Sequence, residues 1–519
     1  MRFSVLPLRG RPPTSARSEA FLVRDNWDDY SYKTLFALRY VDGDGARHDV
    51  GGVKIGQFGR EATPFRIEVP ETFDELPEDC FSLGQDDSYY ENLNELGPEV
   101  RDAVLSALRD IAADQDLFQR ARRERVTGHS LLRSVSVASV QGQFARLARG
   151  GARLSRYSFS YDTPPANRGG VRKVTLTFGV EPESEPPTNI HVLIGRNGVG
   201  KTRLLHLMSR ALVEVDPSAT TGQFNSDDEG TESPFANLVS VTFSAFDDFE
   251  PLPDSRNKAT GLHYSYIGLK RAGTTSEGKP RAPKSPEQLS SEFVKSVRVC
   301  RQGARADRWR RALEMLEADP IFSDANIASI AESGDDTGTS DASSDFEEAA
   351  QTVFKRLSSG HKIVLLTITR LVETVEERSF VLLDEPEAHL HPPLLSAFVR
   401  SLSDLLVNRN GVAIIATHSP VVLQEVPKSC VWKIRRAGSI MNVDRPDVET
   451  FGENVGVLTR EVFGLEVTQS GFHRMLQEAV VEERAYDDVV ARFGSQLGGE
   501  ALALIRAIIA DRRSQRDGL

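Results

Sequence analysis

An eight-residue stretch, GRNGVGKT from Gly195 to Thr202, constrains this chain more than any other part of its sequence. It fits the pattern G-x-x-x-x-G-K-[ST], in which glycines let backbone N–H groups wrap around phosphates. The apolar run IHVLI precedes it and RLLHLMSRALVEV follows it, which predicts a buried strand, a phosphate-binding loop and a helix. A chance glycine turn would explain the loop, but not the strand and helix that flank it.

This loop predicts a nucleotide site in an α/β domain. Lys201 is expected to reach the β- and γ-phosphates, and the Thr202 hydroxyl to bind Mg²⁺. The residues assigned to ATP binding are Gly195, Asn197, Gly198, Gly200, Lys201, Thr202 and Arg203. ATP and Mg²⁺ are therefore the expected cofactors.

A second motif, SFVLLDEPEAHLHP, begins at Ser379. Its apolar run is typical of a strand buried in a parallel sheet, and it delivers Asp384 and Glu385 to the strand's carboxyl end, where ligands bind. Asp384 is expected to hold Mg²⁺, and Glu385 to be the base that activates the attacking water. Acidic strand ends are common on any surface, but a phosphate-binding loop needs such a partner.

A third motif, GVAIIATHSP, predicts another buried strand that ends at Thr417 and is followed by His418. A lone histidine is more often structural than catalytic. Because this one follows a strand of the same expected sheet, we predict that His418 contacts the γ-phosphate.

The stretch RLSSGHK, from Arg356 to Lys362, stands at the mouth of an apolar helix. A helix start with small residues exposes unpaired N–H groups and the positive end of the helix dipole, which together favour an anion. A plain helix cap is the alternative.

The order of these motifs resembles that of the ABC-class ATPases, which have a P-loop, an LSGGQ-like signature, an Asp-Glu strand and a switch histidine. The resemblance implies that the signature caps the γ-phosphate held by a second copy, so that ATP is bound between two copies arranged head to tail. Ser359 replaces the first glycine and His361 the glutamine. The signature residues are Leu357, Ser358, Ser359 and Gly360.

The resemblance covers about Ser155 to Pro420. Within it, EPEAHLHP is similar to ATPases related to the overcoming-lysogenization-defect (OLD) nucleases and to prokaryotic defence ATPases. The family's loop glutamine is not evident; SAFDDFE, from Ser244 to Glu250, is the candidate replacement.

The expected fold class is α/β: an ABC-type P-loop ATPase head with a mixed sheet, an N-terminal α+β extension and a helical insertion. The predicted domains are 1–150, 151–425 with the insertion at about 220–350, and a mainly helical 426–519. In the extension, DGDGA predicts a hairpin turn, and GPEVRDAVLSALRDIAADQDLF predicts one helix. The acidic run from Ala331 to Glu348 is expected to lack packed structure.

Composition limits the partners. The formal net charge is −12, so only a local basic patch could bind nucleic acid; the arginines from Arg298 to Arg311 are the candidate DNA contact. The three cysteines are far apart, and neither a signal peptide nor a membrane-spanning run is apparent, which predicts a cytoplasmic protein without a membrane partner.

An ABC-type ATPase can serve as a transporter subunit, a repair ATPase, part of a nuclease or a regulatory subunit. The long extension and EPEAHLHP argue against a transporter subunit, and the insertion is too short and too rich in Pro and Gly for an SMC-like repair ATPase. No Asp-x-Asp pair or HNH constellation follows Pro420, which argues against an OLD nuclease. The remaining prediction is a regulatory ATPase of an anti-phage defence complex such as Septu, a homodimer or larger oligomer that controls a separate HNH-type nuclease. An ATP-stabilised scaffold with little turnover is the alternative.

Overall fold

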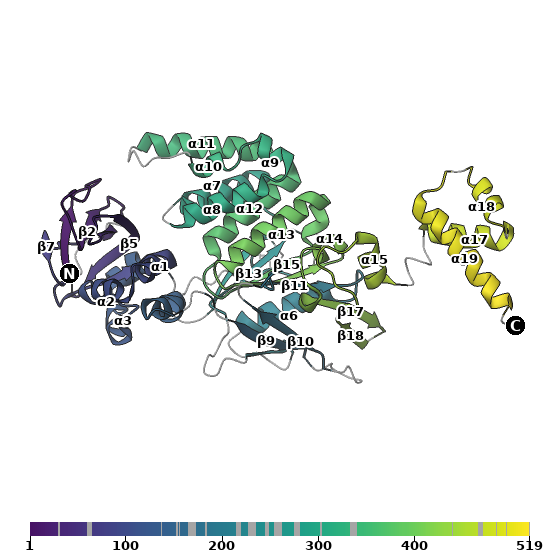
Figure 1. Cartoon of the computed structure of the whole chain (residues 1–519), viewed down its shortest axis with the longest axis horizontal. Coiled ribbons are helices and arrows are strands. Elements are labelled where there is room, and N and C mark those ends of the chain that lie inside the picture. The colour runs from purple at the N-terminus through teal and green to yellow at the C-terminus, as the bar shows by residue number, and fades with distance from the viewer. Residues whose placement is uncertain are drawn as a thin grey trace.

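The structure, a computed structural model, is shown in Figure 1. It describes all residues except 30–31, 60–64, 136, 152–153, 155, 165–172, 182–183, 214–219, 227–234, 244–248, 254–261, 274–280, 302–303, 333–339, 439, 465–470, 484, 495 and 518–519.

A seven-stranded sheet with the order β14-β13-β15-β16-β11-β17-β18 forms the centre of the ATPase domain. All neighbouring strands are parallel except β17 and β18, so the sheet is mixed and the predicted α/β fold class is confirmed. The strands are β11 (Ile190–Ile194), β13 (Asn237–Thr242), β14 (His263–Gly268), β15 (Ser379–Asp384), β16 (Val412–Thr417), β17 (Val431–Ala437) and β18 (Ile440–Asp444).

The central strands are buried along their whole length, as their continuous apolar sequences predict. Successive side chains point to opposite faces, so Val192 and Leu193 of β11 enter two different cores. One core contains α12 (Ser359–Thr374) and α13 (Pro392–Val407); the other contains α6 (Lys201–Val213) and β9 (Tyr157–Asp162). Figure 1 shows these elements on opposite sides of the sheet.

The helical insertion is shorter than predicted. β12 (Gln223–Ser226), β13 and β14 lie within 220–350 but belong to sheets. β12 pairs with one edge of β9, and β10 (Thr175–Val180) pairs with the other. The inserted helices are α7 (Pro286–Cys300), α8 (Ala304–Leu316), α9 (Pro320–Asp324), α10 (Ser329–Glu332) and α11 (Ser340–Arg356).

The prediction that Ala331–Glu348 lacks packed structure is wrong for its second half, where α11 begins at Ser340. The physical reason is an apolar stripe at helical spacing. Phe346, Ala350 and Phe354 are buried in the same core as α12, and this packing outweighs the polar composition of the helix start.

The N-terminal extension is a six-stranded sheet with the order β7-β1-β2-β4-β5-β8 and helices on it. The strands are β1 (Arg2–Leu6), β2 (Glu19–Arg24), β4 (Leu35–Val41), β5 (Arg47–Gln57), β7 (Thr72–Phe73) and β8 (Cys80–Gly84), with β3 (Tyr32–Lys33) and β6 (Phe65–Arg66) as a separate pair. The helices are α1 (Asp87–Glu95), α2 (Pro98–Ala107), α3 (Gln115–Ala121), η1 (Thr127–Leu131), α4 (Val137–Ser139), η2 (Val140–Phe144) and α5 (Ala145–Ala148).

The predicted hairpin is confirmed, because β4 and β5 pair antiparallel across DGDGA. The single helix predicted from Gly97 to Phe118 is wrong, because the chain breaks between α2 and α3. Arg109 has a left-handed backbone with φ 50°, and the following residues turn back so that Ile111 donates its N–H to the Ser82 carbonyl at 2.9 Å.

The C-terminal boundary predicted at 425 also differs, because β17 pairs with β11 and β18 completes the sheet edge. Beyond the sheet lies α15 (Val455–Phe463), and α17 (Gly471–Glu483), α18 (Tyr486–Arg492) and α19 (Gly499–Asp517) pack on one another around their own core. Two short helices, α14 (Pro420–Leu423) and η4 (Lys428–Cys430), precede β17. In the described part of the chain, no helix has both the length and the apolar character needed to span a membrane.

A buried ion cluster joins the N-terminal extension to the ATPase domain. The Arg409 guanidinium lies 3.3 Å from Asp86 Oδ2 and 3.0 Å from Asp87 Oδ2, and Arg308 of α8 lies 3.1 Å from Asp86. Burial disfavours the negative charge on Asp86. The guanidiniums of Arg308 and Arg409 outweigh this effect of burial and hold the pKa of Asp86 well below its usual range. Burial raises the pKa of neighbouring Asp87 to about 7.

Substitution Arg409→Ala tests this junction. It leaves two buried carboxyl groups short of a partner, so we expect the free energy of unfolding to fall by about 3–5 kcal/mol in denaturant titrations. Arg310→Ala is the matched control, because Arg310 pairs with Asp307 on the surface and should contribute about 0–1 kcal/mol. Equal effects of the two substitutions would contradict this account.

Candidate active site

The GRNGVGKT loop connects β11 to α6, as predicted. Gly198 and Gly200 have φ of 79° and 105°, where a side chain would strain the backbone. A Cβ on Gly195 would lie 2.3 Å from the Ile434 carbonyl oxygen, so this glycine lets β17 approach the loop. Backbone geometry therefore requires glycine at all three positions. Arg196, Asn197, Gly198 and Arg203 are exposed on the loop and the first turn of α6.

Lys201 is the buried cation of this loop, with 4 % of its surface exposed. Its ammonium donates to the carbonyls of Gly195 at 2.9 Å and Arg196 at 3.1 Å, and lies 3.9 Å from Glu385 Oε1. Burial lowers its pKa, while the charges of Glu385, Glu387 and Asp384 oppose that shift. The lysine is thus held inside the loop, beside the acidic end of β15.

Asp384 and Glu385 reach that position because β15, β16 and β11 are parallel neighbours. The register aligns Asp384 with Ala416 and Ile194 with Thr417, so the three carboxyl ends share one edge. Asp384 is 9 % exposed. Glu385 has a left-handed backbone with φ 46°, stabilised by its N–H donating to the Ala416 carbonyl at 2.8 Å. Non-glycine residues held in this conformation cluster at functional sites.

His418 lies on the same edge, with its Nδ1 3.7 Å from Glu385 Oε1. The structure therefore places one Glu385 oxygen between the Lys201 ammonium and the His418 ring. Thr202 is the second residue of α6 and is half-buried.

Glu387 is a site residue that the sequence analysis missed. Its Oε1 accepts from the Thr417 hydroxyl at 2.5 Å and the His418 N–H at 2.7 Å, and lies 3.1 Å from His418 Nδ1. A nearly buried carboxylate, 8 % exposed, thus positions the histidine. The only signal was its place in EPEAHLHP, two residues after Glu385.

The predicted signature lies at the start of α12, as its helix-cap chemistry requires. Ser358 is the N-cap and accepts the His361 N–H at 3.5 Å. Leu357 and Gly360 are buried, whereas Ser358 and Ser359 are exposed. A Cβ on Gly360 would lie 2.4 Å from the His389 carbonyl oxygen, so only glycine lets α12 contact η3 (Pro386–His389), the turn after Glu385.

Two other predicted features are the candidate replacement for the loop glutamine and the candidate DNA contact. The Ser244–Glu250 segment follows β13, whose Thr242 is aligned with Asp384, but residues 244–248 lie outside the described part of the chain. Four arginines of the candidate DNA contact make ion pairs within the chain: Arg298 with Glu347, Arg308 with Asp86, Arg310 with Asp307 and Arg311 with Asp404. The DNA contact stays a prediction.

Comparison with known proteins yields a full-length relative. Protein ea59 of Escherichia phage lambda is 42 % identical to this chain over an alignment of 529 positions, which covers 99 % of each protein. This chain belongs to the ea59 family. A family model described as "AAA domain, putative AbiEii toxin, Type IV TA system" matches residues 304–424, which include the signature, the Asp384–Glu385 pair and His418.

Similarity to solved structures is weak. A nucleotide-free ATP-binding cassette from an ABC transporter is 12 % identical, with 56 % of this chain and 91 % of that chain covered and a TM-score of 0.29. The ADP conformation of MJ1267, an ATP-binding cassette of an ABC transporter, is 13 % identical, with coverages of 60 % and 97 % and a TM-score of 0.28. The assignment of a P-loop ATPase domain in this ea59-family chain rests on its own strand order and motifs.

Substitution Glu387→Ala tests the anchor of His418. Hydrogen bonds to a charged group are each worth about 1.5–3 kcal/mol, so we expect unfolding free energy to fall by at least that amount. ATP turnover should fall as well, because the His418 ring loses its position. Glu387→Gln retains an oxygen acceptor and should fall between wild type and alanine in both measurements.

Glu478→Ala is the control for this experiment. Glu478 pairs with Arg474 on an exposed helix face, where such pairs are worth about 0.3–0.5 kcal/mol. Turnover that survives Glu387→Ala unchanged would show that Glu387 only stabilises the fold.

Proposed function

We propose that this chain hydrolyses ATP, with Mg²⁺, at sites shared between two copies arranged head to tail. The observation that carries this proposal is the convergence of Lys201, Glu385 and His418 at one sheet edge, with separations of 3.9 and 3.7 Å from a single carboxylate oxygen. The exposed hydroxyls of Ser358 and Ser359, at a helix start, supply the second half of the site to a neighbouring copy.

Each residue has a distinct task in this proposal. Backbone N–H groups of the glycine loop and the Lys201 ammonium bind the β- and γ-phosphates. Glu385 orients a water for attack and accepts its proton. His418, anchored by Glu387, contacts the γ-phosphate.

Thr202 and Asp384 are the residues that would hold Mg²⁺. The Thr202 hydroxyl and the Asp384 carboxylate both suit this ion, because Mg²⁺ prefers hydroxyl, carboxylate and phosphate oxygens. When bound there, the ion would neutralise charge that develops on the phosphate oxygens. Asp384 is buried at the strand end, where few waters compete for it.

The finer part of the proposal is the biological role: ATP binding and hydrolysis control a separate nuclease in anti-phage defence. Among the described residues, the only group of three His, Cys, Asp or Glu side chains arranged like a metal site is Asp319, His361 and His391, and it lies at the signature. The matched family model carries a toxin-antitoxin description, and the full-length relative is encoded by a phage. The description of the family model and the phage source of the relative both support a role in an effector system that a phage directs against its competitors.

Glu385→Gln is the first test of the ATPase proposal. The amide cannot accept the proton, so we expect phosphate release to fall by about 10²–10⁴-fold, while ATP and Mg²⁺ produce a stable dimer or larger assembly by mass measurement in solution. Lys201→Ala is the control, which should lose both turnover and ATP-dependent assembly. Hydrolysis that persists in Glu385→Gln, with mass independent of ATP, would reject the shared site. ATP-dependent assembly of the wild type without turnover would favour the scaffold.

Complementation between two inactive variants tests whether the site is shared. Ser358→Asp keeps the helix cap but places a negative charge against the γ-phosphate. Mixed with Lys201→Ala, it should regain up to about half of wild-type turnover, because a mixed pair contains one intact site of two: the P-loop of the Ser358→Asp copy with the signature of the Lys201→Ala copy. No recovery in pairs shown to exchange subunits would mean that each copy works alone.

A nuclease assay tests the separate effector. The purified chain with ATP, Mg²⁺ and duplex or single-stranded DNA should leave the DNA intact. Cleavage that Glu385→Gln protein also performs would place a nuclease site within this chain.

A further inference from the structure

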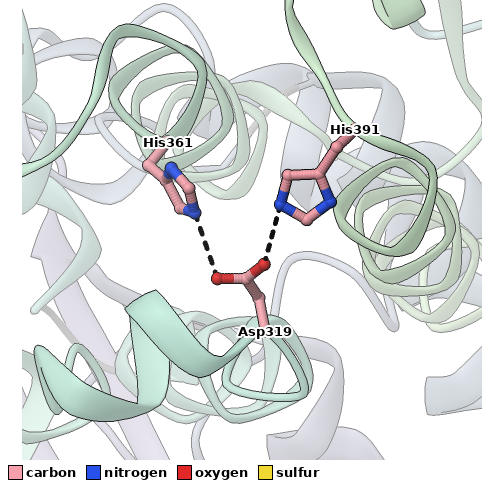
Figure 2. Close-up of side chains that lie close together, drawn as sticks. All are labelled: Asp319, His361 and His391. Atoms are coloured by element: carbon pink, nitrogen blue, oxygen red, sulfur yellow. Dashed lines mark hydrogen bonds and ion pairs between the residues drawn. The ribbon is translucent and has the colours of Figure 1, made fainter.

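A buried carboxylate connects three elements around the signature (Figure 2). Asp319 caps α9, accepting from the N–H groups of Ile321 at 2.9 Å and Phe322 at 3.3 Å. Its Oδ1 lies 3.0 Å from His361 Nε2 on α12, and its Oδ2 lies 3.3 Å from His391 Nε2 at the start of α13. The side chains of Asp319 and His361 are 1 % and 4 % exposed.

The chain of contacts continues to the signature serine. His361 Nδ1 lies 2.6 Å from Ser358 Oγ, so both ring nitrogens of His361 are engaged. Ser358 is exposed and is the residue assigned above to the γ-phosphate of a second copy. A buried carboxylate of the helical insertion therefore connects, through one imidazole, to an exposed hydroxyl.

Asp319, His361 and His391 also have the composition of a metal site, and their ligand atoms lie within 4.8 Å of one another. The hydrogen bonds of His391 favour a different assignment. Its Nδ1 accepts the Leu394 N–H at 3.4 Å, so the neutral ring carries its proton on Nε2, which faces Asp319. Histidine ligands of metals show the opposite pattern, with the second nitrogen acting as a donor. The cluster is thus a set of hydrogen bonds to one carboxylate.

We propose that Asp319 and His361 are positioning residues that determine whether Ser358 can donate a hydrogen bond to the γ-phosphate. The inference rests on the shared ATP site proposed above. Neutral His361, with its proton on Nε2 toward Asp319, accepts the Ser358 proton at Nδ1 and turns the serine lone pairs outward. Protonated His361 donates to both Asp319 and Ser358, which frees the serine proton for a phosphate oxygen.

The proton balance is simple. In each copy, His361 Nδ1 takes up one proton from solution when the γ-phosphate binds. No other covalent bond forms or breaks. The negative charge of Asp319 stabilises the imidazolium that forms. Among the residues that the structure describes, the titratable groups near the His361 ring are Asp319, the N-cap of α9, and His391, the N-cap of α13, whose ring centroid lies 6.1 Å away. The ring of Phe322 lies 4.8 Å away.

The test measures ATP-dependent association of full-length Glu385→Gln protein between pH 6 and 8, where turnover does not interfere. With His361 present, the dimer dissociation constant should decrease as pH falls, by up to about tenfold per pH unit for each signature that takes up a proton. His361→Gln in the same background retains an amide that can donate to Ser358 but does not titrate, so its association should be independent of pH.

Asp319→Asn, in the same association measurement, tests the role of the Asp319 charge. Asparagine keeps the cap of α9, but it lacks the charge that stabilises the imidazolium, so association should weaken by about tenfold and lose its pH dependence. The same substitution should have little effect in His361→Gln protein. His391→Asn retains the cap of α13 and removes the other titratable ring, and it should leave the pH dependence intact.

Three results would overturn the proposal. One is equal pH dependence with and without His361. Another is loss of the pH dependence in His391→Asn alone. The third is one equivalent of zinc bound per wild-type chain and absent from Asp319→Asn protein, which would assign the cluster to a metal. If Glu385→Gln protein shows no ATP-dependent association at any pH, the shared site fails and this inference fails with it; association that is insensitive to His361 removes only the positioning role.

Discussion

The parallel pairing of β15, β16 and β11 is the constraint on which the site depends. Parallel strands bring their carboxyl ends to one edge, and the register aligns Ile194 with Thr417 and Asp384 with Ala416. A shift of one residue in either pair would turn the buried apolar side chains of these strands to the other face. Because alternate side chains of these strands pack into two different cores, such an exchange would disrupt both cores, so their packing fixes the register, and the register places Lys201, Glu385 and His418 together.

Sequence patterns predicted the parts of the fold that depend on local chemistry. Continuous apolar runs predicted β11, β15 and β16. The glycine-rich motif predicted a loop between a strand and a helix, which are β11 and α6. Features that depend on distant packing were not predictable in this way. The contact between His361 and Asp319 spans 42 residues, and β17 joined the central sheet although its sequence is mixed. The helix break at Arg109 likewise follows from a tertiary contact with Ser82, which outweighs helical periodicity.

The segment EPEAHLHP does more than supply Glu385. Glu387 accepts from Thr417 and His418, the His389 carbonyl contacts Gly360, and His391 contacts Asp319. One short turn therefore touches His418, α12 and the insertion. A closely packed turn of this kind has few alternative arrangements, so a displacement at any of its contacts must be shared by the others.

The insertion also connects these contacts to the N-terminal extension. Arg308 of α8 pairs with Asp86, and α8 is followed directly by α9, which Asp319 caps. Spatial continuity alone does not establish coupling, because two sites communicate only when both bias an element with two arrangements. His361 provides such an element, since its two protonation states change what Ser358 can donate. A partner that moved the N-terminal extension could therefore act on ATP closure through α8 and α9, by shifting Asp319 relative to His361. By this route, the extension would act on the signature half of the site.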